Sequence, residues 1–204
     1  MLANVTVADL FRPCEKSKAW FYDSAVVIGG SLLIALCAQL AVGQPVPITG
    51  QTFGVLMVGA LLGSRRGGAS VLVYIIEGLA GLPVFAQGKA GFATLTGPTG
   101  GYLVGFIVAA FVVGWLAERG WDRRIGTTVM AMVLGNITLY AFGLFWLTWL
   151  VRFYGFPVDG KGVLAMGLYP FLIGDLVKIA LAAVLLPSGW KLLGLCGFAQ
   201  KRIP

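Results

Sequence analysis

Asp175 and Lys178 place opposite charges three residues apart inside the apolar stretch FLIGDLVKIALAA. Residues at i and i+3 share one face of a helix, so these two side chains can meet. On insertion scales a charge at the centre of a membrane span costs about 3 kcal/mol, which disfavours retention by chance. A structural ion pair is one interpretation. We favour the other, a site for a neutral ligand with N–H donors beside a carbonyl, such as an amide or a urea.

Three further polar residues lie in apolar surroundings. Glu77, in VYIIEGLAGLPVF, is either a ligand-binding acid or an interfacial residue bonded to loop backbone. Tyr74, one turn earlier on the same face, could add a hydroxyl or a ring to a pocket. Asn136, in LGNITLY, is equally a candidate ligand contact or an interhelical hydrogen-bonding residue.

Composition indicates the elements that must position these residues. Of 204 residues, 58% are hydrophobic and only 11% are charged, against roughly 25% charged in soluble domains. The mean hydropathy is +0.90. The chain is therefore predicted to be an integral, multi-pass protein of the cell membrane, embedded in the lipid bilayer.

The apolar runs predict an all-α, six-helix membrane domain over residues 24–186. It is preceded by a cytoplasmic segment, 1–23, and followed by a cytoplasmic tail, 187–204. The second and third runs, separated by GSRRG, are short enough to form either marginal spans or a re-entrant hairpin. The expected helices are 24–42, 51–62, 67–80, 101–117, 126–151 and 162–186.

The positive charges predict the topology. Only Lys89, Arg152 and Lys161 fall in the loops of the opposite side, and Lys178 lies within a span. Cytoplasmic loops carry the excess of Lys and Arg, so both termini are expected to be cytoplasmic. The eleven residues assigned to that side are Arg12, Lys16, Lys18, Arg65, Arg66, Arg119, Arg123, Arg124, Lys191, Lys201 and Arg202.

Two outward loops combine Gly and Pro with polar and aromatic residues: VGQPVPITGQT (42–52) and GLPVFAQGKAGFATLTGPTGG (81–101). We expect ordered, non-helical backbone near membrane depth, which is tolerated only where protein buries it or where it lines a cavity. A binding site that opens outward is therefore expected here. Its candidate residues in these loops are Gln51, Phe85, Lys89 and Phe92.

The sequence disfavours several other functions. Histidine is absent, and the three cysteines have no metal-ligand spacing, so neither a metal nor a cofactor is expected. The positive residues lie between apolar spans, which indicates membrane topology rather than nucleic-acid binding. GFPVDGKG (155–162) approaches a phosphate-binding loop but lacks the final Ser or Thr. Any ATP dependence must therefore come from other subunits.

The segments PVPITGQTFGVLMVGALLG, EGLAGLPVFAQGKAG, GPTGGYLVGF and GDLVK together resemble the BioY family over about residues 24–186. BioY proteins are the biotin-specific substrate-binding (S) components of energy-coupling-factor (ECF) transporters. The resemblance implies that Asp175 accepts the ureido N–H groups of biotin, with Lys178 at or beside the ureido carbonyl. It also implies closure of the outer loops over the ligand, with Phe85 or Phe92 against the thioether ring and chain.

The resemblance implies partners as well: a membrane coupling subunit and two cytoplasmic ATPases, although some BioY proteins are proposed to act alone. S components commonly present an A-x-x-x-A stretch of the first helix to the coupling subunit. Ser31 and Ala35 are the best match here. The alternative to biotin uptake is a proton-coupled carrier for another small metabolite, which would use Glu77, Asp175 and Lys178. An intramembrane enzyme is disfavoured because no nucleophile–base motif is present.

Overall fold

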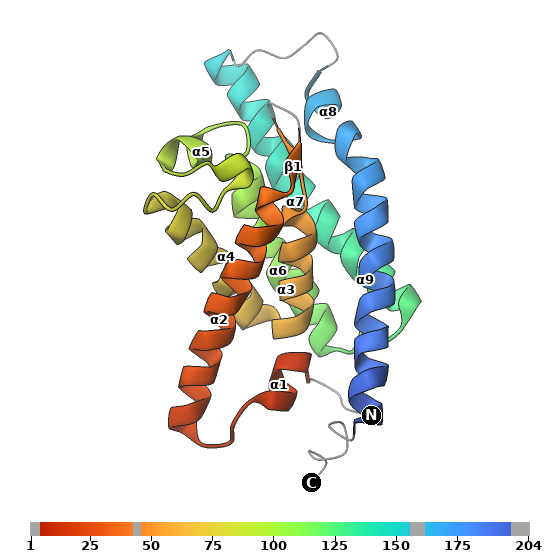
Figure 1. The fold of residues 1–204 in the computed structure, drawn as a ribbon. Coiled ribbons are helices and arrows are strands. Elements are labelled where there is room, and N and C mark those ends of the chain that lie inside the picture. Colours follow the sequence, from red (N-terminus) through yellow and green to blue (C-terminus); the bar gives the residue numbers. More distant parts are fainter. Residues whose placement is uncertain (1–4, 43–45, 156–161, 197–204) are drawn as a thin grey trace.

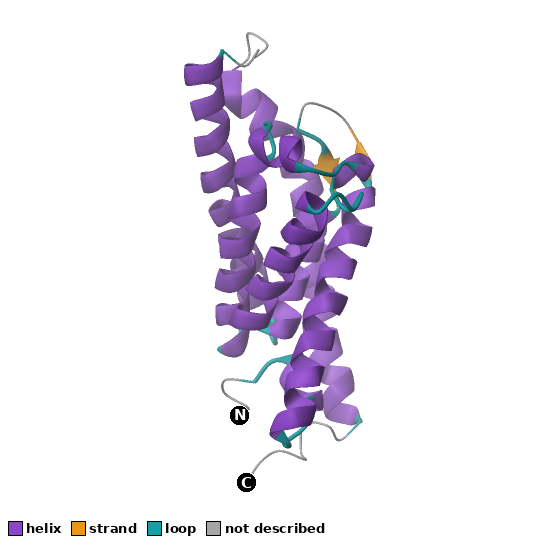
Figure 2. Ribbon diagram, turned by 90° about the vertical axis from the view of Figure 1, so that its left-hand side faces the viewer, coloured by secondary structure: helices purple, strands orange, loops and turns teal. Residues whose placement is uncertain are grey.

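The computed structural model describes residues 5–42, 46–155 and 162–196. In these ranges the chain forms an elongated helical bundle with one small β-hairpin (Figures 1 and 2). Helix α1 and the C-terminal end of α9 lie at one end of the bundle, called here the α1 end. The hairpin, η1, α5 and α8 lie at the opposite end, called here the hairpin end. The helices are α1 (Val7–Phe11), α2 (Lys16–Gln39), α3 (Gln51–Leu62), α4 (Ser64–Leu79), the 3-10 helix η1 (Ala86–Gly88), α5 (Phe92–Thr96), α6 (Gly100–Glu118), α7 (Ile125–Tyr154), α8 (Gly162–Gly167) and α9 (Tyr169–Leu195).

Four segments in the described part of the chain are long and apolar enough to cross a membrane: Lys16–Gln39, Gly100–Glu118, Ile125–Tyr154 and Gly162–Leu195. Helix α3 is apolar but has only 12 residues, fewer than the ~17 that a spanning helix needs. The all-helical prediction is confirmed in this coarser form. Helices α6 and α7 begin and end within three residues of the predicted limits.

The first long helix begins at Lys16, so the prediction that it begins at Ser24 was wrong. Its polar first turns are held by ion pairs. Asp23 lies 2.8 Å from Arg12 and 2.9 Å from Arg66 of α4. Because this carboxylate is paired rather than left in an apolar environment, the helix can continue through it.

The turn between α3 and α4 is a single residue, not the predicted GSRRG segment. Gly63 has φ +86°, a left-handed conformation that glycine adopts without steric cost. Helix α4 then begins at Ser64, whose backbone N–H and hydroxyl both donate to Glu118 Oε1 at 2.8 Å. This carboxylate caps the helix, which explains why Arg65 and Arg66 are helical rather than part of a turn.

The last predicted helix is broken near its start and extends beyond its predicted end. Leu168, with φ −131° and ψ −60°, separates α8 from α9. Helix α9 continues past Leu186 to Leu195 with Pro187 inside it. The final turns are anchored because Trp190 Nε1 donates to Asp122 Oδ2 at 2.5 Å.

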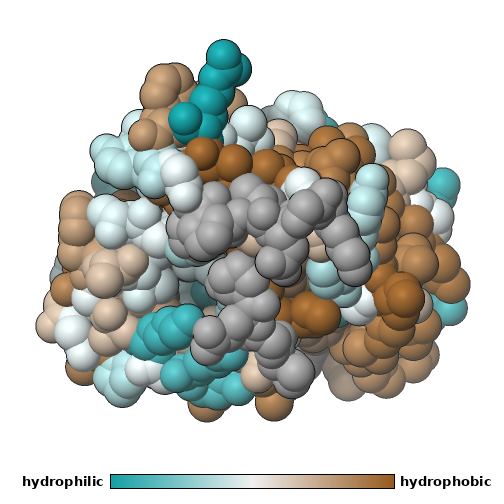
Figure 3. Space-filling model, turned by 90° about the horizontal axis from the view of Figure 1, so that it is seen from above, coloured by the Kyte–Doolittle hydropathy of each residue, from teal (hydrophilic) through white to brown (hydrophobic). Residues whose placement is uncertain are grey.

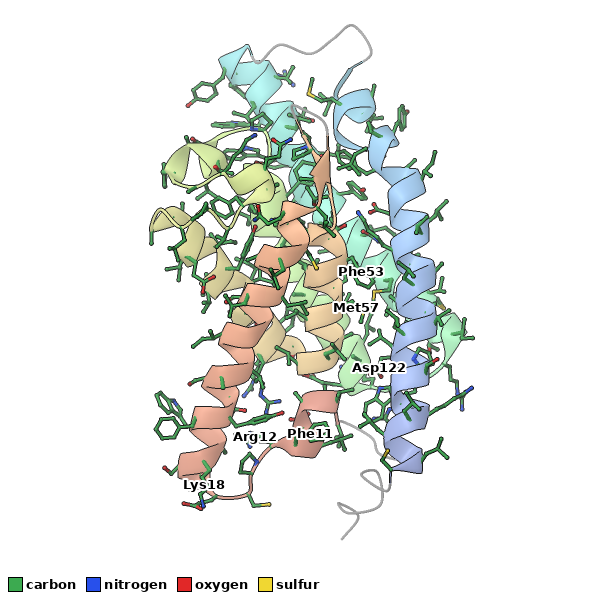
Figure 4. All side chains as sticks on the ribbon, in the orientation of Figure 1. Phe11, Arg12, Lys18, Phe53, Met57 and Asp122 are labelled. Carbon is green, nitrogen blue, oxygen red and sulfur yellow. The ribbon has the colours of Figure 1, made fainter. Side chains whose placement is uncertain are left out.

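Asp122 is part of the connection between α6 and α7 and lies beside the lower half of α9 (Figure 4). Its side chain is buried. Burial raises the pKa of this carboxyl to about 6, although the Trp190 hydrogen bond and the Arg123 charge favour the ionised form. The neighbouring Arg123 donates to the Val5 carbonyl at 2.9 Å, so this region also holds the N-terminal segment.

In their described residues, the two loops predicted to face outward are not wholly non-helical as expected. Segment 81–101 contains η1 and α5. In segment 42–52, strands β1 (Ala41–Val42) and β2 (Ile48–Thr49) pair antiparallel, with Ala41 opposite Thr49. Residues 43–45 of this loop lie outside the described residues. So do most of GFPVDGKG and the topology residues Lys161, Lys201 and Arg202.

The core lies where α2, α3, α4 and α6 meet, with α7 packed along α6 and α9 along α7. Small residues permit the close approaches: a Cβ on Gly67 would lie 2.8 Å from Gly59 Cα, and one on Gly59 would lie 2.5 Å from the Ala110 carbonyl oxygen. On the other face of α3, Phe53 and Met57 project toward α9 (Figure 4). This arrangement leaves α9 close to α3 at the level of Lys178.

Candidate functional site

The Asp175–Lys178 pair forms as the spacing predicts. Lys178 Nζ lies 3.0 Å from Asp175 Oδ1 on α9. Asp175 is buried, with 4% of its surface exposed. Lys178 also donates to Thr52 Oγ1 on α3 at 2.8 Å. The pair therefore joins α9 to α3 instead of facing lipid.

Tyr140 on α7 is the principal residue that the sequence analysis missed. Its hydroxyl donates a hydrogen bond to Asp175 Oδ2, the carboxylate oxygen that Lys178 leaves free. Tyr140 lies four residues after Asn136, so the polar face of this apolar helix extends over one more turn. The sequence signal for Tyr140 was a hydroxyl-bearing aromatic residue on the same helix face as Asn136. This signal is weak, because apolar spans commonly contain aromatic residues that only pack.

A pocket opens beside these side chains at the hairpin end of the bundle. About 630 Å³ of space, counting the part open to solvent, lies between its walls. The lining comes from the hairpin, the 81–101 segment and helices α3, α6, α7 and α9: Val46, Pro47, Thr49, Gln51, Thr52, Phe85, Ala86, Lys89, Thr94, Thr99, Tyr102, Leu103, Phe106, Leu139, Tyr140, Phe171 and Lys178. Seen from this end, the surface alternates hydrophilic and hydrophobic patches (Figure 3).

Gln51, Tyr74 and Phe85 attach the 81–101 segment to the bundle. Gln51 Nε2 donates to the Tyr74 hydroxyl at 2.6 Å, and that hydroxyl donates to the Val84 carbonyl at 3.1 Å. The Phe85 and Tyr74 rings pack edge to face, with 5.6 Å between their centroids, and Phe85 is only 1% exposed. Of these three residues, Gln51 and Phe85 line the pocket, and Tyr74 lies behind them.

Of the other predicted site residues, Lys89 lines the pocket, whereas Phe92 and Glu77 lie outside it. Lys89 lines the pocket and is its second positive charge besides Lys178. Phe92 is 66% exposed on α5 and does not line the pocket. Glu77 lies outside the pocket as well, with its Oε1 accepting a hydrogen bond from Ser31 of α2 at 3.1 Å.

Asn136 lies next to the site rather than in the main pocket. It lines a smaller cavity of about 200 Å³ that also includes Thr52 and Lys178. Its Oδ1 is buried and has no hydrogen-bond partner among the described residues. Thr52 and Lys178 therefore line both the main pocket and this smaller cavity.

The chemistry of the pocket is that of recognition. Its walls are mostly apolar, and its polar groups are two ammonium groups, hydroxyls and one amide, with a carboxylate directly behind. Among the described residues, no three His, Cys, Asp or Glu side chains lie close enough together to hold a metal ion. A ligand with a planar hydrogen-bonding head and an apolar body fits such a lining.

An apolar helical bundle with a largely apolar pocket open at one end is the architecture of a membrane solute-binding protein. Residues 14–195 match the BioY family, and the chain belongs to that family. The chain is 40% identical to the biotin transporter BioY of Rhizobium etli over 69% of this chain and 76% of the relative. It is 37% identical to the biotin transporter BioY of Thermotoga maritima over 82% of this chain and 90% of the relative.

A solved structure, the S-component for biotin from an ECF-type ABC transporter, matches with a TM-score of 0.70 and 26% identity. The match covers 87% of this chain and 95% of the other. The predicted resemblance to BioY is therefore confirmed. The relatives are named as transporters, in agreement with the expectation that the chain is not an enzyme.

Proposed function

We propose that this protein takes up biotin as the membrane-embedded, substrate-binding S component of an ECF-type transporter. The observation that carries the proposal is the Asp175–Lys178 pair beside the pocket, in a chain whose family relatives are named biotin transporters. Biotin offers a planar ureido group, an apolar bicyclic body with a hydrocarbon chain, and a terminal carboxylate. The pocket provides complementary groups for all three.

The ureido head binds at α9. Asp175 accepts the ureido N–H groups, because a carboxylate has about four lone-pair positions and keeps some free after bonding Tyr140 and Lys178. Lys178 and the Thr52 hydroxyl lie beside the ureido carbonyl. In the empty protein the two charges neutralise each other, which lowers the cost of their burial.

The body of the ligand packs against the aromatic and aliphatic lining, including Phe85, Phe106 and Phe171. Lys89, in the segment that covers the pocket, is the partner for the carboxylate, since it is the other positive charge of the lining. Gln51 and Tyr74 hold segment 81–101, called here the covering segment, against the bundle. Asn136, in the smaller cavity, and Glu77, bonded to Ser31, support the site from outside the pocket.

The membrane arrangement is part of the proposal. The chain lies in the cell membrane with six membrane segments, namely α2, α3, α4, α6, α7 and α8–α9, over about residues 24–186. Of these, α3 and α4, with 12 and 16 residues, are marginal spans. Residues 1–23 and 187–204 lie on the cytoplasmic side, so the hairpin end faces outward. A coupling subunit and two ATPases complete the transporter. The expectation that Ser31 and Ala35 face the coupling subunit was wrong, because both residues are buried within the bundle and Ser31 donates to Glu77 of α4.

Identification of the bound molecule tests the proposal. We expect protein purified in detergent from biotin-supplied cells to carry biotin in stoichiometric amount, as measured by mass spectrometry of the denatured sample. Protein stripped of ligand should bind biotin again in a titration. Purified, folded protein that neither retains nor rebinds biotin, but retains another small molecule, would reject biotin as the substrate.

A further inference from the structure

A third hollow lies on the outer surface of the bundle, between α4 and α6 and away from the pocket that Lys178 lines. This open groove spans about 860 Å³, including the space open to its surroundings. Its walls are apolar along most of their length and include small residues that leave room between the helices. The lining residues are Ser64, Arg65, Gly68, Ala69, Leu72, Ile107, Val108 and Phe111.

Positive charge gathers at the α1 end of this groove. Arg65 lines the groove itself, and its exposed side chain makes no hydrogen bond or ion pair within the described ranges. Glu118 is the nearby acid, and its Oε1 accepts both the Ser64 N–H and the Ser64 hydroxyl. Those bonds place the start of α4 against the end of α6, so the residue after Glu118 also lies at this end of the groove.

That residue is Arg119. Its guanidinium lies 3.3 Å from the centre of the Trp115 ring and donates to the Trp115 carbonyl at 3.0 Å. Trp115 is four residues after Phe111 and seven after Val108, so it continues the groove face of α6. Partly exposed Trp rings beside Arg are typical of the depth at which lipid headgroups begin.

We propose that this groove binds one anionic phospholipid. An acyl chain lies between α4 and α6 along Gly68, Ala69 and Leu72, and the phosphate lies between Arg65 and Arg119. Arginine donates to phosphate oxygens from a planar fork, which makes it well suited to this contact. The apolar groove alone would accept any acyl chain, whereas the two arginines at one end select a lipid with net negative charge.

The test compares phosphatidylglycerol with phosphatidylcholine of the same acyl chains, counting lipids retained on the purified protein by native mass spectrometry. We expect the parent protein to retain phosphatidylglycerol at least tenfold more than phosphatidylcholine. The double variant Arg65→Gln/Arg119→Gln should lose this preference. The matched control Arg124→Gln/Lys191→Gln removes two exposed positive charges from the same end outside the groove and should keep the preference.

A second variant tests the groove without changing charge. A Cβ on Gly68 would meet only the Ile107 carbonyl oxygen, at 3.9 Å, so Gly68→Leu fits the fold and fills the groove. Retention of phosphatidylglycerol should fall although both arginines remain. Thermal unfolding of the variants confirms that they are folded, and none of these measurements depends on biotin.

Three results would overturn the proposal. Equal retention of the two lipids by the parent would remove the charge preference. Equal loss in both double variants would show diffuse attraction to the whole α1 end. A photoreactive residue at Leu72 that cross-links in native membranes to another protein, rather than to lipid, would assign the groove to a protein partner.

Discussion

The Tyr140 hydroxyl on α7 donates a hydrogen bond to Asp175 on α9, on the carboxylate oxygen opposite the one that Lys178 contacts. Asp175 is thus held from two sides, by a neutral donor of another helix and by a cation of its own helix. Both Tyr140 and Lys178 line the pocket while Asp175 lies behind them. The carboxylate is positioned before any ligand arrives, which favours tight binding.

Asp175→Asn should weaken biotin binding at least tenfold. The amide turns one acceptor oxygen into a donor that faces a ligand N–H, and it leaves Lys178 without its counter-charge. Hydrogen bonds to charged groups contribute about 1.5–3 kcal/mol, and about 1.4 kcal/mol is tenfold in affinity. Isothermal titration of the purified variant measures the change. Unaltered affinity in a well-folded Asp175→Asn protein would reduce Asp175 to a structural partner of Lys178.

Lys178→Met distinguishes two roles for the Asp175–Lys178 pair, that of a ligand-binding site and that of a purely structural ion pair. It leaves Asp175 unpaired, so it should also weaken biotin binding. The double variant Asp175→Asn/Lys178→Met removes both charges and should unfold at a higher temperature than either single variant, yet still fail to bind. Thermal unfolding and biotin titration are measured on all three. Recovery of binding in the double variant contradicts the proposed role.

Tyr140→Phe removes only the hydroxyl that positions Asp175. We expect a loss of about fivefold to tenfold in biotin affinity, roughly 1–1.4 kcal/mol. This is less than for Asp175→Asn, because the hydroxyl only positions the carboxylate and the ring still packs. Thr138→Val is the matched control on the same helix, since the half-buried Thr138 donates its hydroxyl hydrogen bond to the Leu134 carbonyl of its own helix. Equal effects of the two substitutions on affinity would argue against a positioning role for Tyr140.

Phe85 and Phe92 should respond differently to truncation. Phe85→Ala empties a site that is 1% exposed, and such changes cost about 3–5 kcal/mol. Both thermal stability and biotin binding should fall, because the ring anchors the segment that covers the pocket. Phe92→Ala, at a site 66% exposed, should alter neither by more than the scatter of the measurement. The reverse order would place Phe92 rather than Phe85 against the ligand.

The pKa of Asp122 predicts a pH-dependent stability difference between the parent and Asp122→Asn. Its folded pKa of about 6 lies above the ordinary value of 3.8, so folding favours the protonated form. This contribution is fully present below pH 3.8 and is lost as the pH rises through 6. At about 1.36 kcal/mol per pKa unit, it amounts to roughly 2–3 kcal/mol.

The amide keeps an acceptor for Trp190 and carries no charge. Asp122→Asn should therefore be more stable than the parent at pH 7, with the difference disappearing by pH 4. Asp9, whose pKa is lowered by hydrogen bonds with Thr6 and Arg66 that outweigh its larger burial effect, gives an opposite dependence. The Asp9 contribution is the same in the parent and in Asp122→Asn, so it cancels in the difference between their stabilities. Thermal unfolding at pH 4, 5, 6 and 7 measures the difference, and a constant difference across that range would contradict the assignment.

The proposed topology can be tested with native and introduced cysteines. Cys14 and Cys196 are exposed and free at the α1 end, so a membrane-impermeant thiol reagent should label them only after the cells are opened. Leu82→Cys, at a position 51% exposed in the covering segment, should react in intact cells in a background without the native cysteines. Gly88 is less suitable because its φ of +68° disfavours a side chain. Labelling of Leu82→Cys only in opened cells would invert the topology.

The sequence alone determined the class of protein, the two long helices α6 and α7, and the Asp175–Lys178 pair. Each follows from local pattern: apolar run length, and the rule that i and i+3 meet on one helix face. The GDLVK segment carries both charges, so no knowledge of neighbouring helices was needed to bring them together.

The tertiary structure alone decided which residues surround that pair. Tyr140 and Thr52 lie 35 and 126 residues from their partners on α9, and only the packing of α7 and α3 against α9 brings them there. The same holds for the helix limits, since Asp23 is helical because Arg66 pairs with it, and α9 passes Pro187 with its end held by Asp122. Such contacts depend on the relative rotation and depth of helices, which apolar periodicity leaves undetermined when every face of a helix is hydrophobic.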